Sequence, residues 1–428
     1  MGTEALSRRT FLAVAGLAGL SVPLLGACGD DSDSSSGKTT FEWWTIATTE
    51  PSKSLFPRLA REYMQANPNV TIKHTALEND AYKAKMTALI ASGKLPDVFH
   101  TWGGGVLKQQ IDAGLVKDLT KDIASWSGTI KPLALEAYQF DGKTYGVPYD
   151  YGLVGFWYNK ALFRQAGIEG TPTTWTQFLD AVRKLKAADI TPIALAGKEK
   201  WPGHYYWAYL AMRIGGLNAL KQAQAGNDFS GPAFVQAGER LKELVDLQPF
   251  QQGFLGADYS SPTGQAATMG NAKAAMELMG QWAPSVQSDA GKGIGNDLGF
   301  FTFPTVEGGQ GAATEAFGGG NGWALREGAP NAALDFLKWF SSVEINRRLV
   351  ASKGFQPVVK GAENAVADAN LRTVVQTLDR ATGFQLFLDQ AFPPAVGQQV
   401  NDSVAALIAG KSAPEAVTEA ITKTAKSQ

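Results

Sequence analysis

The sequence predicts an α/β fold from its alternation of strand and helix patterns, and the apolar content and the single cysteine indicate that apolar cores stabilise this fold. From residue 40 onward, short runs rich in β-branched and aromatic residues alternate with longer runs whose apolar residues recur every three or four positions. Such alternation is typical of α/β domains built on a parallel sheet. Hydrophobic residues make up 44% of the 428 residues, and Cys28 is the only cysteine. The fold must therefore be stabilised by apolar cores, because no disulfide can form within the chain.

The first strands and helices can be followed in order. The helical spacing of Leu55, Leu59 and Tyr63 predicts a helix that stops before Asn67-Pro68, and a second predicted helix ends at Gly93. Three strands are expected around these helices. The expected order is a strand at 40–45, a helix at 55–66, a strand at 70–74, a helix at 82–92 and a strand at 96–100.

Two of these strands end at residues suited to ligand binding. In open α/β sheets, ligands bind beyond the carboxyl ends of the strands. Trp44 lies at the end of the first predicted strand, and Thr101 and Trp102 follow the third. The three glycines at 103–105 would allow a ligand to approach the backbone closely. We therefore expect a binding site at this edge of the sheet.

Later segments carry two further signals. Thr174, with Gln177 three residues on, predicts the start of a helix. A glycine cluster at 318–322 leads into a predicted strand. We expect these glycines to supply the backbone freedom that a crossover between two domains requires.

The N-terminal segment predicts export. Residues 7–12, Ser-Arg-Arg-Thr-Phe-Leu, resemble a twin-arginine signal, and residues 25–28, Leu-Gly-Ala-Cys, resemble a lipobox whose cysteine is acylated. The apolar run between them, 11–25, is 15 residues long, whereas a membrane-spanning helix needs about 20. We expect a cleaved signal peptide at 1–27, lipidation of Cys28, and a flexible tether at 28–37 rich in Ser, Gly and Asp.

Charge and histidine content exclude several classes of function. With 39 basic and 40 acidic residues, the chain lacks the basic surplus of a nucleic-acid-binding protein, so a neutral ligand is expected. The three histidines, His74, His100 and His204, are far apart and lack the spacing of metal ligands. We expect neither a metal nor a cofactor.

Seven landmarks, taken in order, carry a family resemblance. They are Trp-Trp at 43–44, 94–98, 145–148, 157–160, 276–282, the glycine cluster at 318–322, and 333–340. They resemble family 1 of the extracellular solute-binding proteins that deliver sugars to ABC importers, the group that includes maltose-binding protein. The resemblance implies a two-lobed periplasmic-binding-protein fold of type II, with the ligand in a cleft between the lobes and no enzymatic activity.

The resemblance also implies where the lobes divide. Each lobe is expected to be discontinuous in sequence. The expected boundaries are 38–148 with 319–356 for lobe 1, 151–316 with 357–428 for lobe 2, and hinges near 149–150 and 317–318.

A saccharide offers apolar C–H faces and a rim of hydroxyl groups. Its binder therefore needs aromatic side chains for the faces and polar side chains, above all carboxylates, for the rim. Carried over by position, the resemblance implies ligand-binding roles for Trp44, Thr48, Thr49, Thr101, Trp102, Gly103, Asp150, Glu199, Trp201, Trp282, Gly320 and Asn321.

The segment 99–105, together with 109–115, is more similar to actinobacterial binders of short oligosaccharides, the xylobiose type among them. The implied partners are a neutral carbohydrate, with oligosaccharides favoured, and the transmembrane subunits of an ABC permease. We expect a monomer that meets the membrane only through its lipid anchor, on the extracytoplasmic face.

Two other interpretations stay open at this point. The same fold could bind a non-sugar solute, although a phosphate ligand would favour Arg or Lys, which the expected cleft positions lack. An exported glycoside hydrolase would need two carboxyl groups about 5 to 9.5 Å apart. Asp150, Glu199 and Glu277 could supply them, but no distinctive acid/base motif surrounds them.

Overall fold

The computed structural model of the protein describes residues 37–428. The expected signal peptide, Cys28 and the tether up to residue 36 lie outside the described residues. Lys38–Gln428 form one compact unit. Within the described part, no helix is long and apolar enough to span a membrane.

The larger sheet has the strand order β11-β10-β3-β1-β2, with β6 paired to β10. β1 is parallel to β2 and β3, and β10 is parallel to β11, whereas β10 is antiparallel to β3 and β6. The parallel arrangement expected for the first three strands is confirmed, but the complete sheet is mixed. Its strands are β1 (Thr39–Thr45), β2 (Val70–Ala76), β3 (Val98–Thr101), β6 (Val147–Leu153), β10 (Glu315–Leu325) and β11 (Gly383–Leu386).

Five main helices accompany the β1–β2–β3 part of this sheet. The apolar stripe of α1 buries Leu55, Leu59 and Tyr63, as the spacing predicted. Together with Trp43 and Trp323, these residues belong to one apolar core. The helices are α1 (Ser52–Ala66), α2 (Asn79–Ser92), α3 (Gly104–Asp112), α11 (Asn331–Phe340) and α12 (Val343–Ala351); smaller elements are η1 (Ser127–Thr129), α4 (Pro132–Glu136), β4 (Gln139–Phe140) and β5 (Lys143–Thr144).

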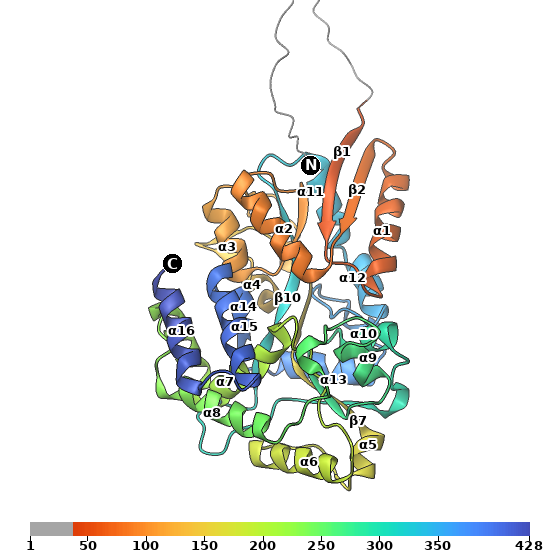
Figure 1. Cartoon of the computed structure of the whole chain (residues 1–428). Helices are drawn as coiled ribbons and strands as arrows, with labels where there is room; N and C mark the ends of the chain where they lie inside the picture. Colours follow the sequence, from red (N-terminus) through yellow and green to blue (C-terminus); the bar gives the residue numbers. More distant parts are fainter. Residues whose placement is uncertain (1–36) are drawn as a thin grey trace, which may run out of the picture. The chain divides into compact units, whose positions relative to one another are not determined.

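A second sheet is antiparallel, with the order β8-β7-β9. Most of its surroundings are helical, and α7, α8, α15 and α16 pack on one another, as Figure 1 shows in green and blue. Its strands are β7 (Gly155–Asn159), β8 (Met276–Met279) and β9 (Leu298–Phe301). The remaining elements are α5 (Lys160–Gln165), α6 (Trp175–Ala187), α7 (Trp201–Gly226), α8 (Pro232–Asp246), η2 (Phe254–Gly256), α9 (Gln265–Gly270), α10 (Ala283–Ala290), η3 (Gly295–Asp297), η4 (Glu363–Ala365), α13 (Ala369–Asp379), α14 (Leu388–Ala391), α15 (Pro394–Ile408) and α16 (Pro414–Lys426).

Local capping explains several helix ends. The Glu78 side chain accepts hydrogen bonds from two N–H groups in the first turn of α2, and Gly93 ends that helix with a φ of 67°. Thr174 caps α6 by accepting from the Gln177 N–H, as predicted. The five expected elements between residues 40 and 100 are all present, with ends that differ by up to three residues.

The glycine cluster has another role than expected. Gly318, Gly319, Gly320 and Gly322 lie inside β10, and none of them has a positive φ. A Cβ on Gly318 would overlap the Gly152 carbonyl of β6. The cluster is therefore required for close packing and not for unusual backbone angles.

β6 pairs with β10 along most of the length of β6. These two strands connect the elements around the first sheet with those around the second. β10 lies near the centre of the view in Figure 1. The fold is α/β with two lobes, as predicted, and the residue boundaries of the lobes stay a prediction.

Candidate ligand-binding cleft

A cavity lies where the β1–α1 loop, the start of α2, the start of α7, the start of α10, β10 and α14 come together. It encloses about 1170 Å³ of empty space, including the part open to solvent, which is sufficient for a small ligand. Nine of the twelve expected site residues line it. They are Thr48, Thr49, Trp102, Asp150, Glu199, Trp201, Trp282, Gly320 and Asn321.

The other three expected residues are not part of this lining. Trp44 is half-buried and packs against an apolar core. Thr101 is buried, and its hydroxyl accepts a hydrogen bond from the Gly103 N–H. A Cβ on Gly103 would overlap the Ala137 carbonyl, so this glycine permits contact with a neighbouring segment of the chain. At the end of β3, it is Trp102 that lines the cavity.

Asp150, which lines the cavity, holds together three segments of the chain. One carboxylate oxygen accepts from Gln281 Nε2 at 2.7 Å and Asn321 Nδ2 at 3.1 Å, and the other accepts from the Gln356 N–H at 2.7 Å. Burial raises the pKa of Asp150 to about 6, although these hydrogen bonds act in the opposite direction. The side chain lies in β6 opposite the irregularity of β10 between Asn321 and Gly322.

The Gly-Gln-Trp sequence at 280–282 explains how Trp282 reaches the cavity. A Cβ on Gly280 would overlap the Trp282 ring, so only glycine leaves room for this ring orientation. Gln281 extends in the other direction to Asp150, and Gly152 leaves space for its amide. Trp282 itself is half-buried, and its ring lies 6.2 Å from that of Phe387.

Glu199 and Trp201 form a second polar and aromatic pair. Glu199 accepts hydrogen bonds from Trp201 Nε1 at 3.0 Å and from the Tyr259 N–H at 3.1 Å. Burial, helped by the nearby carboxylates of Asp80 and Glu78, raises the pKa of Glu199 to about 7, although the hydrogen bond from the Tyr259 N–H acts in the opposite direction. Near neutral pH this carboxyl group can therefore donate as well as accept a hydrogen bond.

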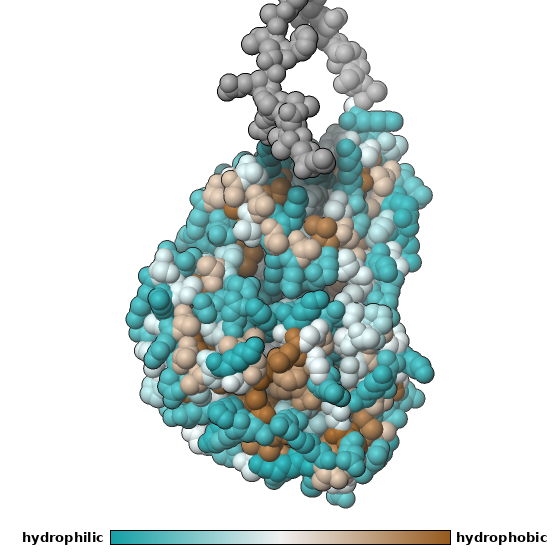
Figure 2. All heavy atoms as spheres, in the orientation of Figure 1, coloured by the Kyte–Doolittle hydropathy of each residue, from teal (hydrophilic) through white to brown (hydrophobic). Residues whose placement is uncertain are grey.

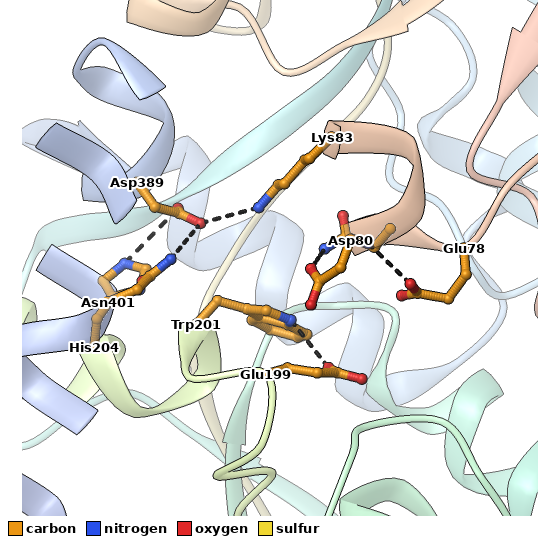
Figure 3. Close-up of polar contacts among 9 residues, drawn as sticks. Glu78, Asp80, Lys83, Glu199, Trp201, His204, Asp389 and Asn401 are labelled. Carbon is orange, nitrogen blue, oxygen red and sulfur yellow. Dashed lines mark hydrogen bonds and ion pairs between the residues drawn. The ribbon is translucent and has the colours of Figure 1, made fainter. Parts of the chain in front are cut away.

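Sequence reasoning missed an ion pair that lines the cavity, so the cleft carries a lysine that the expected positions lacked. Lys83 Nζ of α2 lies 3.3 Å from Asp389 Oδ2 of α14 and 5.3 Å from the centre of the Trp102 ring. Asn401 Nδ2 also donates to Asp389, at 3.4 Å. Figure 3 shows Lys83 and Asp389 pointing toward each other from different elements.

The family assignment comes from comparison with known proteins. A family model described as bacterial extracellular solute-binding protein matches residues 47–346. The chain belongs to this family. Two curated relatives of this solute-binding protein are the multiple sugar-binding protein of Streptococcus mutans, 26% identical over 81% of this chain and 82% of the relative, and the diacetylchitobiose binding protein of Streptomyces coelicolor, 25% identical over 85% and 86%.

Solved structures agree with the fold. A structure from work on xylan utilisation by Caldanaerobius polysaccharolyticus matches this solute-binding protein with a TM-score of 0.84 and 27% identity, covering 90% of this chain and 99% of that one. A chitin oligosaccharide binding protein matches with the same TM-score and identity, covering 91% and 98%. The two-lobed periplasmic-binding-protein fold is thereby established.

Two of the three carboxylates considered for hydrolysis, Asp150 and Glu199, line the cavity. Glu277, the third of them, is fully buried and accepts from Gln265 and Gln287. It is absent from the cavity lining. Among residues 37–428, no group of three or more His, Cys, Asp or Glu residues could hold a metal ion.

Proposed function

We propose that this solute-binding protein is the lipid-anchored receptor of an ABC importer and binds a neutral saccharide, with oligosaccharides favoured. One observation carries the proposal: a single cavity is lined by the indoles of Trp102, Trp201 and Trp282 and by carboxyl and amide side chains. Aromatic faces pack against the C–H faces of a sugar, while the polar groups bind its hydroxyls. The names of the sugar-binding and diacetylchitobiose-binding relatives support the same class of ligand.

In this proposal the ligand is gripped between the lobes. Trp102 and Lys83 would bind it from lobe 1, and Glu199, Trp201 and Trp282 from lobe 2. A ligand that contacts both lobes shifts the population toward the closed form by its difference in affinity for the two forms. The permease then recognises the closed form and receives the solute.

Thermal unfolding of the purified protein with xylobiose, maltose, cellobiose and diacetylchitobiose tests the ligand class. A ligand that binds only the folded state raises the melting temperature. We expect at least one disaccharide to raise it and to be recovered unchanged. No rise with any saccharide would contradict the proposed ligand class, and consumption of the saccharide would favour a hydrolase.

A further inference from the structure

Glu277 is a charged residue in the interior of the protein. Hydrophilic residues predominate on the face of the molecule seen in Figure 2, whereas Glu277, in β8, is fully buried. Gln265 Nε2 donates to one of its carboxylate oxygens at 2.9 Å, and Gln287 Nε2 donates to the other at 2.6 Å. Both glutamines are fully buried as well. Since well-packed apolar side chains are often as stable at such positions, this buried network indicates a role besides stability.

The Gln265 side of the network leads to Glu199. Gln265 Oε1 accepts a hydrogen bond from the Ala196 N–H at 2.7 Å, in the loop that carries Glu199. The Gln265 N–H donates to the Asp258 carbonyl at 2.8 Å, and the N–H of the next residue, Tyr259, donates to the Glu199 carboxylate. Gln265 therefore holds both the loop of Glu199 and the loop that bonds to Glu199.

The Gln287 side of the network leads to Trp282. Gln287 lies in α10, and Trp282 is the N-cap residue of this helix. The Trp282 carbonyl accepts from the Val286 N–H at 3.2 Å and from the Ser285 hydroxyl at 2.8 Å. α10 packs on α9, as Figure 1 shows, and a Cβ on Gly270 of α9 would overlap the Gln287 carbonyl. A shift of α10 would therefore move Trp282.

We propose that Glu277 is a positioning residue of the ligand-binding cleft, which sets the position of Glu199 relative to Trp282. Glu277 does not line the cavity, whereas Glu199 and Trp282 do, so it acts on a ligand only through these two residues. A carboxylate suits this role because both of its oxygens accept hydrogen bonds and both glutamine amides donate. This inference rests on the proposed function and adds a residue that determines affinity without touching the ligand.

Glu277→Leu tests the role, because it removes both acceptors and keeps a side chain of similar size. The two glutamine amides then lose their common partner, so the loop of Glu199 and α10 can shift apart. Since a binding site tolerates only small displacements of its contact residues, affinity for the disaccharide that raises the melting temperature should fall about tenfold.

Glu277→Gln should restore the affinity. Among residues 37–428, Gln287 Oε1 is a buried atom without a hydrogen-bond partner. A rotated Gln287 amide can therefore accept from the introduced amide, while Gln265 still donates to its oxygen. The two sides of the network stay joined in this variant.

Asn159→Leu is the matched control. Asn159 is buried at the end of β7, which pairs with β8. Its side-chain oxygen accepts two hydrogen bonds, from the N–H groups of Ala161 and Leu162, and it does not line the cavity. Asn159→Leu should lower the melting temperature, because α5 loses its cap, and should leave the affinity unchanged.

Calorimetric titration of each protein well below its melting temperature gives the affinity, and thermal unfolding shows which variants are folded. If Glu277→Leu does not fold, Gln287→Leu takes its place, because it removes only the bond to α10. Gln287→Leu should weaken binding about threefold, half of the tenfold change in free energy.

Unchanged affinity of the folded Glu277→Leu protein would overturn the proposal, as would unchanged affinity of Gln287→Leu where Glu277→Leu is unfolded. An equal loss of affinity in Asn159→Leu, or no recovery in Glu277→Gln, would also overturn it. Failure of the unsubstituted protein to bind any saccharide would instead contradict the proposed function, so the two failures are distinguishable.

Discussion

The carboxylates of the cleft differ in their hydrogen-bond partners. Asp150 accepts three hydrogen bonds from the chain, one of them from the cavity-lining amide of Asn321. Glu199 accepts two, from one side chain and one backbone N–H. Glu199 therefore keeps more capacity for a ligand, whereas Asp150 also positions the strands around it.

Trp282→Ala should weaken saccharide binding by about tenfold, because the variant loses an aromatic platform. The half-buried ring packs against an apolar core, as the ring of Trp126 does, and the fold should persist without it. Titration with the disaccharide that raises the melting temperature measures the effect. Trp126→Ala is the control, since Trp126 is half-buried against a core and does not line the cleft. Equal affinity of Trp282→Ala and the unsubstituted protein would remove Trp282 from the site.

The buried Glu277 predicts a pH dependence of stability. Burial raises its pKa to about 7 from an ordinary value of 4.5, so the folded state holds this proton more tightly than the unfolded state. The resulting stabilisation is complete below pH 4.5 and is lost as the pH rises through 7. Glu277→Gln lacks this titration, so its free energy of unfolding should gain about 2 kcal/mol relative to the unsubstituted protein between pH 5 and 8.

Urea unfolding of both proteins across this range measures the difference, in which the titrations of Asp150, Glu199 and the histidines cancel. Parallel pH profiles would show that Glu277 does not titrate there.

At the scale of strands and helices, local sequence patterns were sufficient to predict the structure where a single segment determines its own conformation. The apolar stripe on α1 and the Thr174 cap of α6 were both predicted from the sequence. Lys83 and Asp389 were not, because the fold brings together two residues far apart in the sequence. Lys83 has the pattern of a surface helix residue, and Asp389 follows a short strand with no distinctive motif.

The packing of β10 on β6 makes its glycines sensitive to substitution. Gly318→Ala should lower the free energy of unfolding by about 2 kcal/mol or more, because the added methyl group overlaps the backbone of β6. Gly226→Ala is the control, since a Cβ there meets no atom within 4 Å. Urea midpoints compare the two. A Gly318→Ala protein as stable as the control would contradict this, because β6 and β10 could then move apart enough to accept the methyl group without a loss of stability.

For the whole molecule, the proposal requires attachment to a membrane through the N-terminal cysteine. Cys28→Ser removes the thiol that the lipid would modify, so the variant should leave the membrane fraction while binding saccharide with unchanged affinity. Fractionation of cells that express the two forms, with immunoblotting of each fraction, gives the answer. Continued attachment of Cys28→Ser would contradict the lipobox.

The sheet order also constrains biosynthesis. β3 lies between β1 and β10, and β10 begins at residue 315 of 428. A ribosome has therefore made about three-quarters of the chain before β3 can pair on its second side. Until then its unpaired N–H and C=O groups are open to other chains. Translation that stops before β10 should yield aggregates rather than an independently folded first lobe.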